Sequence, residues 1–145
     1  MRLFNHTIWI AKSREQVFDF FTDFSQSSRW RSYVRTMELV GPGPVREGST
    51  LHVVMDLQGG EYTFDLHVLT CERPSLWRHR TNETDFFGAI EYRFVTEGEG
   101  TRVTMTGDAK PMTLYGWLAM PMLWLRRGQA YREQLPQLKR AIEDG

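Results

Sequence analysis

One histidine stands among aromatic residues, and it is the side chain of this sequence best suited to chemistry. His79 shares its strand parity with Trp77, and the same face of the predicted sheet carries Tyr92. An imidazole in such surroundings can bond a ligand's carbonyl or hydroxyl group, or exchange protons near neutral pH. It can also be a core histidine bonded to a neighbouring hydroxyl, such as that of Thr81 or Tyr62. The sequence favours the core histidine and leaves the ligand role open.

A second polar group, formed by His52, Asp65 and His67, is expected on the opposite face, with His52 directly across from His67. Histidines beside a carboxylate can bind a metal ion, but a flat solvated face supplies no closed site. The sequence also lacks a cysteine pair at zinc spacing, an HExxH motif, a phosphate-binding glycine loop and a GxSxG elbow. We therefore expect no metal and no cofactor, and the sequence favours a binding protein over an enzyme.

The strands that must position these residues are predicted from alternation and turn signals. Residues 49–57 and 61–71 alternate with period two, and Gly59-Gly60 between them is a two-residue hairpin signal. A tight turn there pairs Leu51 with Val68. This hairpin therefore has one apolar face and one polar face.

Three further turns, at residues 72–75, 84–85 and 97–100, continue the construction with a single register. On the apolar face the predicted pairs are Val68–His79, Thr70–Trp77, Trp77–Tyr92, Tyr92–Met105 and Phe94–Val103. On the reverse face they are Arg78–Glu91 and Arg93–Thr104. We expect an antiparallel meander whose apolar face needs a cover.

Two short helices are predicted after the first strand, which spans residues 3–10. Ser13 has the residue type of an N-cap for a helix that extends to Phe24, and a poorer helical segment follows at residues 25–33. With the long helix described next, these elements predict a single α+β domain over residues 1–145.

A long amphipathic helix is predicted over residues 111–144. Its apolar face is formed by Leu114, Trp117, Leu118, Pro121, Trp124, Leu125, Gly128, Tyr131, Leu135, Leu138 and Ile142. This face should pack against the apolar face of the sheet. Pro121 and Pro136 should kink or interrupt the helix because proline lacks the backbone donor.

A ligand-sized space is expected between sheet and helix. An aromatic stripe is often simple core, but Gly128 within the stripe and Gly107 on the facing strand favour a void. The residues expected to line it are Tyr62, Phe64, Trp77, His79, Tyr92 and Met105 on the sheet, and Trp117, Met120, Trp124 and Tyr131 on the helix.

The composition of the chain limits the classes of partner that it can be expected to bind. Eighteen basic residues balance 18 acidic ones, so no net charge attracts nucleic acid. The uncharged run at residues 112–125 is shorter than the roughly 20 apolar residues that a bilayer crossing needs, which leaves surface attachment as the membrane option. Cys71 has no partner and no export signal is present, so we expect a reducing cytoplasm. The oligomeric state is not indicated.

Several short motifs occur in a recognisable order: residues 17–24 (VFDFFTDF) followed by Arg29-Trp30, Glu47-Gly48 before a strand, Arg73-Pro74 between strands, residues 100–103 (GTRV), and Leu138-Lys139 near the end of the final helix. In this order and spacing the chain resembles the START-like superfamily of polyketide cyclase/dehydrase and lipid-transport proteins. The resemblance implies a helix-grip fold, in which a curved antiparallel sheet wraps around the long C-terminal helix.

The resemblance also implies a cavity for an apolar or aromatic small molecule, such as a lipid, a polyketide or a quinone-like compound. Members include carriers, hormone receptors, coenzyme-Q-binding proteins and aromatase/cyclases, so the fold does not choose the function. Ligand binding is the leading hypothesis. The alternatives are a polyketide cyclase or dehydratase that uses His79 or a tyrosine as acid/base, and an interaction module that presents residues 112–125 to a membrane or a protein.

Overall fold

The computed structural model describes residues 2–57, 60–81, 86–111, 114, 118 and 132–144. In chain order the labelled elements are β1 (Arg2–Ile10), α1 (Arg14–Phe21), η1 (Phe24–Gln26), α2 (Ser27–Trp30), β2 (Val34–Leu39), β3 (Thr50–Leu57), β4 (Gly60–Glu72), β5 (Leu76–Thr81), β6 (Phe86–Glu97) and β7 (Gly100–Pro111). Residues 132–144 are helical and are called the C-terminal helix below.

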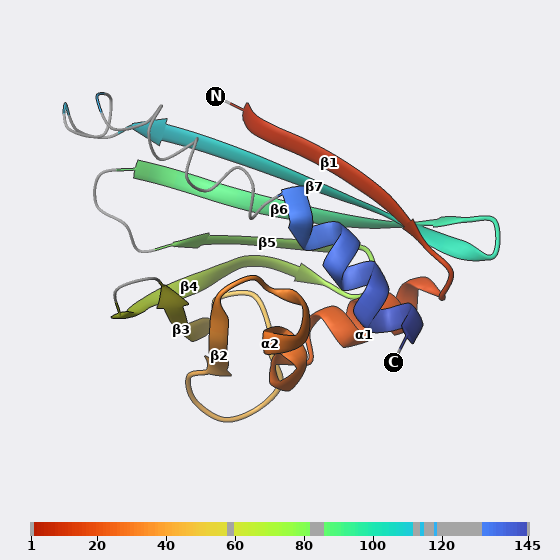
Figure 1. Cartoon of the computed structure of the whole chain (residues 1–145), viewed down its shortest axis with the longest axis horizontal. Helices are drawn as coiled ribbons and strands as arrows, with labels where there is room; N and C mark the ends of the chain where they lie inside the picture. Colours follow the sequence, from red (N-terminus) through yellow and green to blue (C-terminus); the bar gives the residue numbers. More distant parts are fainter. Residues whose placement is uncertain are drawn as a thin grey trace.

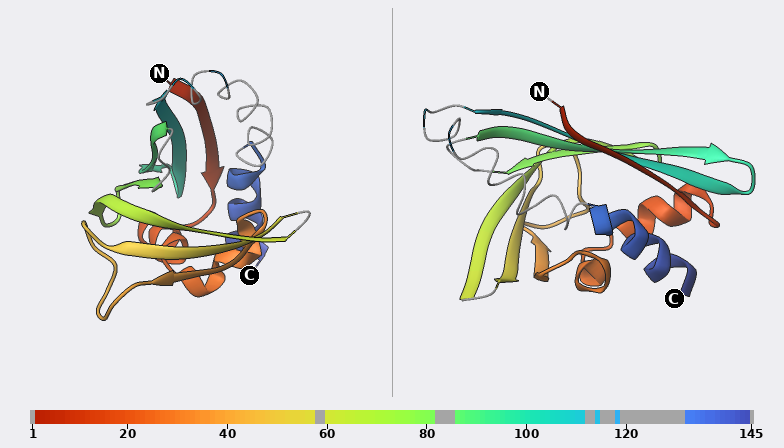
Figure 2. Two further views of the ribbon diagram at one scale, coloured as in Figure 1. Left: turned by 90° about the vertical axis from the view of Figure 1, so that its left-hand side faces the viewer. Right: turned by 45° about the horizontal axis from the view of Figure 1, so that its top comes forward.

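All strands belong to one antiparallel sheet of seven strands in the order β1-β7-β6-β5-β4-β3-β2. The sheet is strongly curved, and α1, α2 and the C-terminal helix lie on its concave side (Figures 1 and 2). The predicted α+β arrangement, with a curved sheet around the C-terminal helix and short helices after the first strand, is confirmed.

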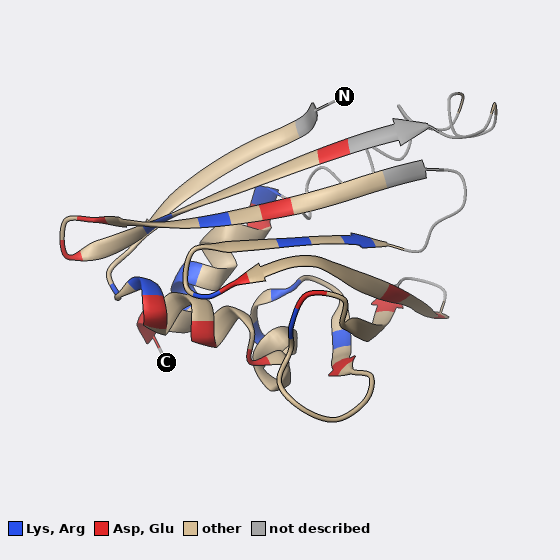
Figure 3. Ribbon diagram, turned by 180° about the vertical axis from the view of Figure 1, so that it is seen from behind, with Lys and Arg blue, Asp and Glu red and all other residues tan. Residues whose placement is uncertain are grey.

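The predicted register is confirmed from β5 to β7. Trp77 pairs with Tyr92, and Tyr92 pairs with Met105. All three side chains are buried on the concave side, at 1% exposure or less. On the reverse face Arg78 lies opposite Glu91, and charged residues of both signs follow the strands there (Figure 3).

The predicted register of the β3–β4 hairpin is wrong by two residues. Leu51 pairs with Leu66 instead of Val68, because Leu57 pairs with Gly60 and the connection therefore falls one residue earlier than the predicted Gly59-Gly60 turn. A shift of two keeps every side chain on its predicted face. It does change the partners, so that His52 lies across from Asp65 and not from His67.

The register also shifts between β4 and β5. Val68 pairs with His79 as predicted, but a bulge between Val68 and Thr70 places Thr70 opposite Arg78. Trp77 is therefore paired with Cys71, not Thr70. One extra residue in β4 absorbs the shift, and such a bulge has no signature in the alternation.

The strand β2 was not predicted. Along Val34–Leu39 only Met37 is buried, so the segment shows no two-residue alternation. It pairs with β3 at the edge of the sheet.

The N-terminal helices are shorter than predicted. Ser13 is the N-cap of α1 as expected, and its hydroxyl accepts from the Gln16 amide while the Gln16 side chain accepts from the Ser13 amide. The helix ends at Phe21, three residues before the predicted end. The second predicted helix is divided into η1 and the single turn of α2.

The C-terminal helix buries Leu135 and Leu138, at 1% and 0% exposure, as its pattern predicts. It continues through Pro136, so of the two predicted effects, a kink or an interruption, the interruption does not occur there, and Pro121 lies outside the described residues. Leu114 and Leu118 are 76% and 75% exposed, which contradicts their place on a buried stripe. Helical spacing shows which residues share a face, but not whether that face is covered. Within the described residues, no helix is long and apolar enough to cross a membrane.

Gly107 does not mark a void. A Cβ atom at this position would lie 2.3 Å from the ring of Phe4, which reaches over it from β1. The missing side chain therefore makes room for a protein ring and not for a ligand. The other predicted marker, Gly128, lies outside the described residues.

Candidate functional site

The centre of the concave face combines aromatic rings with hydrogen-bonding groups. Trp77 and His79 point to the same side of β5, and Tyr92 joins them from β6. The Trp77 Nε1–H group donates a hydrogen bond of 2.8 Å to His79 Nδ1. In the neutral imidazole this leaves the proton on Nε2, which is therefore the donor. The expected hydroxyl partner, Thr81 or Tyr62, is replaced by the indole of Trp77.

His79 is poorly suited to proton exchange near neutral pH. Burial, and secondarily the charge of Arg31, lower the pKa of His79 to about 3. The ring is thus uncharged over the physiological range. It can orient a ligand by hydrogen bonding, but as a base it is weak.

Tyr92 links the sheet to the C-terminal helix. Its hydroxyl donates to the Gln134 side-chain oxygen, and its ring lies 4.6 Å from that of Phe21 on α1. Gln134 was not among the predicted site residues, because its amide sits beside the apolar stripe in the sequence and looks solvated. The contact fixes the position of the hydroxyl on the concave side.

Arg31, directly after α2, is the main residue that the sequence analysis missed. Its side chain is buried, at 7% exposure. The guanidinium carbon lies 4.0 Å from the Trp30 ring centroid and 5.1 Å from that of Phe21. Burial lowers the pKa of Arg31, while the charge and hydrogen bonding of Tyr92 raise it. Arginine remains protonated under these conditions, so the interior holds a positive charge.

Several donors in this region have no acceptor. Within the described part of the chain, the Nε and Nη2 atoms of Arg31 and the Nε1 atom of Trp30 are buried without a hydrogen-bond partner. Each unsatisfied buried donor costs about 1–3 kcal/mol, and more when it is charged. Such a cluster therefore requires an explanation beyond packing.

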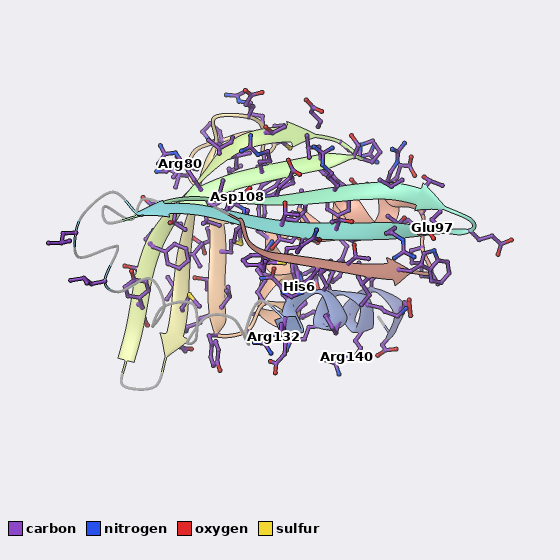
Figure 4. All side chains as sticks on the ribbon, turned by 90° about the horizontal axis from the view of Figure 1, so that it is seen from above. His6, Arg80, Glu97, Asp108, Arg132 and Arg140 are labelled. Carbon is purple, nitrogen blue, oxygen red and sulfur yellow. The ribbon has the colours of Figure 1, made fainter. Side chains whose placement is uncertain are left out.

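A groove of about 530 Å³ runs between α2 and the C-terminal helix. Its lining consists of Ser28, Arg29, Trp30, Arg31, Ser32, Tyr33, Gln137, Arg140, Ala141 and Asp144. Across it the Ser32 hydroxyl donates to the Gln137 side-chain oxygen at 3.1 Å. Arg140 lies on the side of the helix that faces away from the sheet (Figure 4). None of the predicted ligand-lining residues that the structure describes belongs to this lining.

The predicted site residues do not all come together. Trp77, His79, Tyr92 and Met105 form one buried group, with exposures of 4% or less. Tyr62 is 45% exposed and packs on Phe64, near the far end of β4. Six residues separate it from Val68, the partner of His79, which is roughly 20 Å along a strand. The helix positions Trp117, Met120, Trp124 and Tyr131 lie outside the described residues.

The polar group on the outer face is divided into separate contacts. His52 Nδ1 lies 2.9 Å from an Asp65 oxygen, whereas His67 Nδ1 lies 3.4 Å from the Thr50 hydroxyl. Among the described residues no three histidine, cysteine or acidic side chains are arranged to hold a metal ion.

Comparisons with solved structures identify the fold. The Zhui aromatase/cyclase from Streptomyces sp. R1128 matches with a TM-score of 0.76 and 17% identity, over 97% of this chain and 92% of that chain. A START superfamily protein from Mycobacterium smegmatis matches with 0.76 and 16%, over 97% of both chains. A protein from Thermus thermophilus matches with 0.75 and 19%, over 97% and 96%. These matches confirm the helix-grip fold.

The family of this chain is shown by the match of its sequence to a family model. A search of curated proteins gave no match. The family model described as polyketide cyclase / dehydrase and lipid transport matches residues 1–143, which is nearly the whole chain. The chain, with its curved sheet and polar concave centre, therefore belongs to the polyketide cyclase / dehydrase and lipid transport family.

Proposed function

We propose that this protein binds an apolar or aromatic small molecule between the concave face of the sheet and the C-terminal helix. The observation that carries the proposal is the buried group of Trp77, His79 and Tyr92, beside the unsatisfied donors of Arg31. An interior that needs only to be packed is more stable when built from apolar side chains. Hydrogen-bonding groups at the centre of an aromatic surface instead suit a ligand that must be oriented.

Relatives support the class of ligand. The family description names polyketide cyclases and lipid transport, and one structural relative is an aromatase/cyclase. A polyketide fits both descriptions, a lipid fits the family description, and a quinone-like compound shares the apolar character of both. The aromatic side chains of the sheet, with Trp117, Met120, Trp124 and Tyr131 of the predicted long helix, would remove the ligand's apolar surface from water. Such burial stabilises a complex by about 25 cal/mol per Å².

The binding surface is testable with a matched pair of variants on β6. Ile90 is partly buried and shares its face with His79, whereas Val95 is 57% exposed and has the opposite parity. We expect wild-type protein to bind the neutral fluorescent probe 1-pyrenebutanol saturably. Ile90→Trp should weaken this binding by about tenfold or more by filling the space, and Val95→Trp should not. Equal affinities of the two variants, both folded by circular dichroism, would contradict the proposed surface.

A cyclase or dehydratase acting on a polyketide-like substrate is the second candidate. The family description and the aromatase/cyclase relative favour it. The low pKa of His79 makes the Tyr92 hydroxyl, beside the Arg31 charge, the better proton donor. A simple assay follows the aldol condensation of 2,6-heptanedione, which forms a C–C bond and releases water. This candidate requires catalysis that Tyr92→Phe abolishes while 1-pyrenebutanol still binds.

Surface attachment through residues 112–125 is the third candidate. The exposed side chains of Leu114 and Leu118 favour it. Sedimentation with phosphatidylcholine vesicles, lost in the double variant Leu114→Glu/Leu118→Glu, would support it. Absence of sedimentation would leave the enclosed ligand as the better explanation.

A further inference from the structure

The unsatisfied donors of Arg31 form one edge of its guanidinium group. In arginine the Nε–H and one N–H of Nη2 point the same way, and this edge matches the two oxygens of a carboxylate. In Arg31, which is 7% exposed, both of these nitrogens lack a partner among the described residues. The open edge is therefore a two-donor site in the interior.

Other arginines of this protein show what the same edge binds. Arg73 donates from Nε and Nη2 to the two oxygens of Asp19, at 2.8 and 2.9 Å. Arg102 uses the same two nitrogens for both oxygens of Glu97. Each of these exposed edges holds a carboxylate. At Arg31 the protein supplies none among its described residues.

The rings around Arg31 do not replace that partner. Trp30 and Phe21 contact the guanidinium over their ring faces, at 4.0 and 5.1 Å from the centroids. A cation–π contact stabilises the charge but accepts no in-plane hydrogen bond. The two rings therefore position the guanidinium group of Arg31 but leave its Nε and Nη2 donors without an acceptor in the described part of the structure.

Arg31 borders a groove that faces solvent. Arg31 and Trp30 both line the groove between α2 and the C-terminal helix. Arg29 and Arg140 line it too, and Asp144 is the one acidic residue among the described lining residues. The groove is thus more positive than negative, which favours the approach of an anion.

We propose that Arg31 binds the carboxylate of an amphipathic ligand, whose apolar body lies against the concave face. The proposal rests on the proposed ligand-binding function and specifies the ligand class as an apolar or aromatic carboxylic acid. The Nε and Nη2 atoms of Arg31 donate to the two carboxylate oxygens, as Arg73 does to Asp19. Tyr92, which already interacts with Arg31, adds a neighbouring hydroxyl.

The test compares 1-pyrenebutyrate with 1-pyrenebutanol, which differ only in the carboxylate. We expect wild-type protein to prefer the acid by about tenfold or more, as a charge-assisted pair in a buried site would give. Arg31→Met should remove the preference by weakening only the acid. Arg73→Met, which removes an exposed arginine, should leave it unchanged. Arg31→Lys keeps the charge without the two-donor edge and should keep only part of the preference.

The outcomes separate the two proposals. If wild-type protein binds the alcohol as tightly as the acid, the carboxylate site is wrong and the ligand-binding function stands. If neither probe binds, the proposed function fails and this inference fails with it. If Arg31→Met does not fold, the proposal is decided by two other measurements: the ratio of the wild-type affinities for the acid and the alcohol, and the same ratio for Arg31→Lys. A preference that survives unchanged in Arg31→Lys would assign recognition to charge alone and overturn the two-donor geometry.

Discussion

Arg31 and Arg73 present the same guanidinium edge to opposite surroundings. At the surface, Arg73 and Asp19 are each 55% exposed, and the edge is filled by a carboxylate. In the interior, the edge of Arg31 is unfilled and its faces lie against aromatic rings. The ion pair of Arg73 lies at the surface, where such a pair contributes little to stability. Arg31 has no carboxylate partner among the described residues, although a buried charge is costly without one. This distribution is the one expected if Arg31 has the proposed role in binding and not a role in stability.

The largest expected effect comes from removing the ring that supports the buried charge. Phe21 is 0% exposed, and its ring contacts those of Trp30, Trp77, Tyr92 and Phe94. We expect Phe21→Ala to lower the free energy of unfolding by about 3–5 kcal/mol, because it leaves a cavity. Urea denaturation measures this change.

Phe20 provides the matched control. It is only partly buried, and Arg29 lies over its ring at 5.7 Å on the solvent side. Phe20→Ala should therefore destabilise much less than Phe21→Ala. Equal losses would mean that the two arginine–phenylalanine contacts are equivalent and would break the contrast between interior and surface.

The burial of Arg31 could not be predicted from the sequence. Arg29 and Arg31 flank Trp30 in a polar segment, and both look solvated by residue type. Only one is buried, because α2 is a single turn whose end faces the concave side. Which residue points inward depends on how that turn packs against the sheet and the C-terminal helix, and no local pattern encodes this.

The sheet could be predicted more fully than the burial of Arg31, because strand alternation and turn residues are signals between neighbours in the sequence. Parity placed Trp77, His79 and Tyr92 on one buried face, and the turn at residues 97–100 fixed the register of β6 and β7. Alternation of period two cannot detect a slip of two residues, which explains the error in the β3–β4 hairpin. It also cannot detect the bulge in β4 or a strand such as β2 with one buried side chain.

A smaller effect is expected from pH, through the neighbour of the buried charge. The pKa of His79 is about 3 in the folded protein, against an ordinary value of 6.5 for a solvated histidine. Between these values the unfolded chain takes up a proton that the folded chain does not. The contribution of His79 to stability is therefore complete above about pH 6.5 and decreases toward pH 3, by up to ~1.4 kcal/mol per pH unit.

The variant His79→Gln isolates this contribution. Glutamine is uncharged and can still accept the hydrogen bond from Trp77. The difference in unfolding free energy between wild type and variant, measured from pH 7 to pH 4, cancels every contribution that the two proteins share. We expect the wild type to lose stability faster on acidification. Parallel pH profiles would show that His79 is not held neutral beside Arg31.

The smallest effects, and the sharpest contrast, concern the two arginines themselves. Arg73→Met should lower the free energy of unfolding only slightly, because solvent screens an exposed ion pair. Arg31→Met loses a cation–π contact of ~0.5–2 kcal/mol and the hydrogen bond with Tyr92. It also relieves two unpaired donors that cost about 1–3 kcal/mol each. We therefore expect Arg31→Met to be as stable as the wild type or slightly more stable in thermal and urea unfolding. If Arg31 instead stabilised the fold, Arg31→Met would lose more stability than Arg73→Met. A loss above about 2 kcal/mol in Arg31→Met would identify Arg31 as a structural residue.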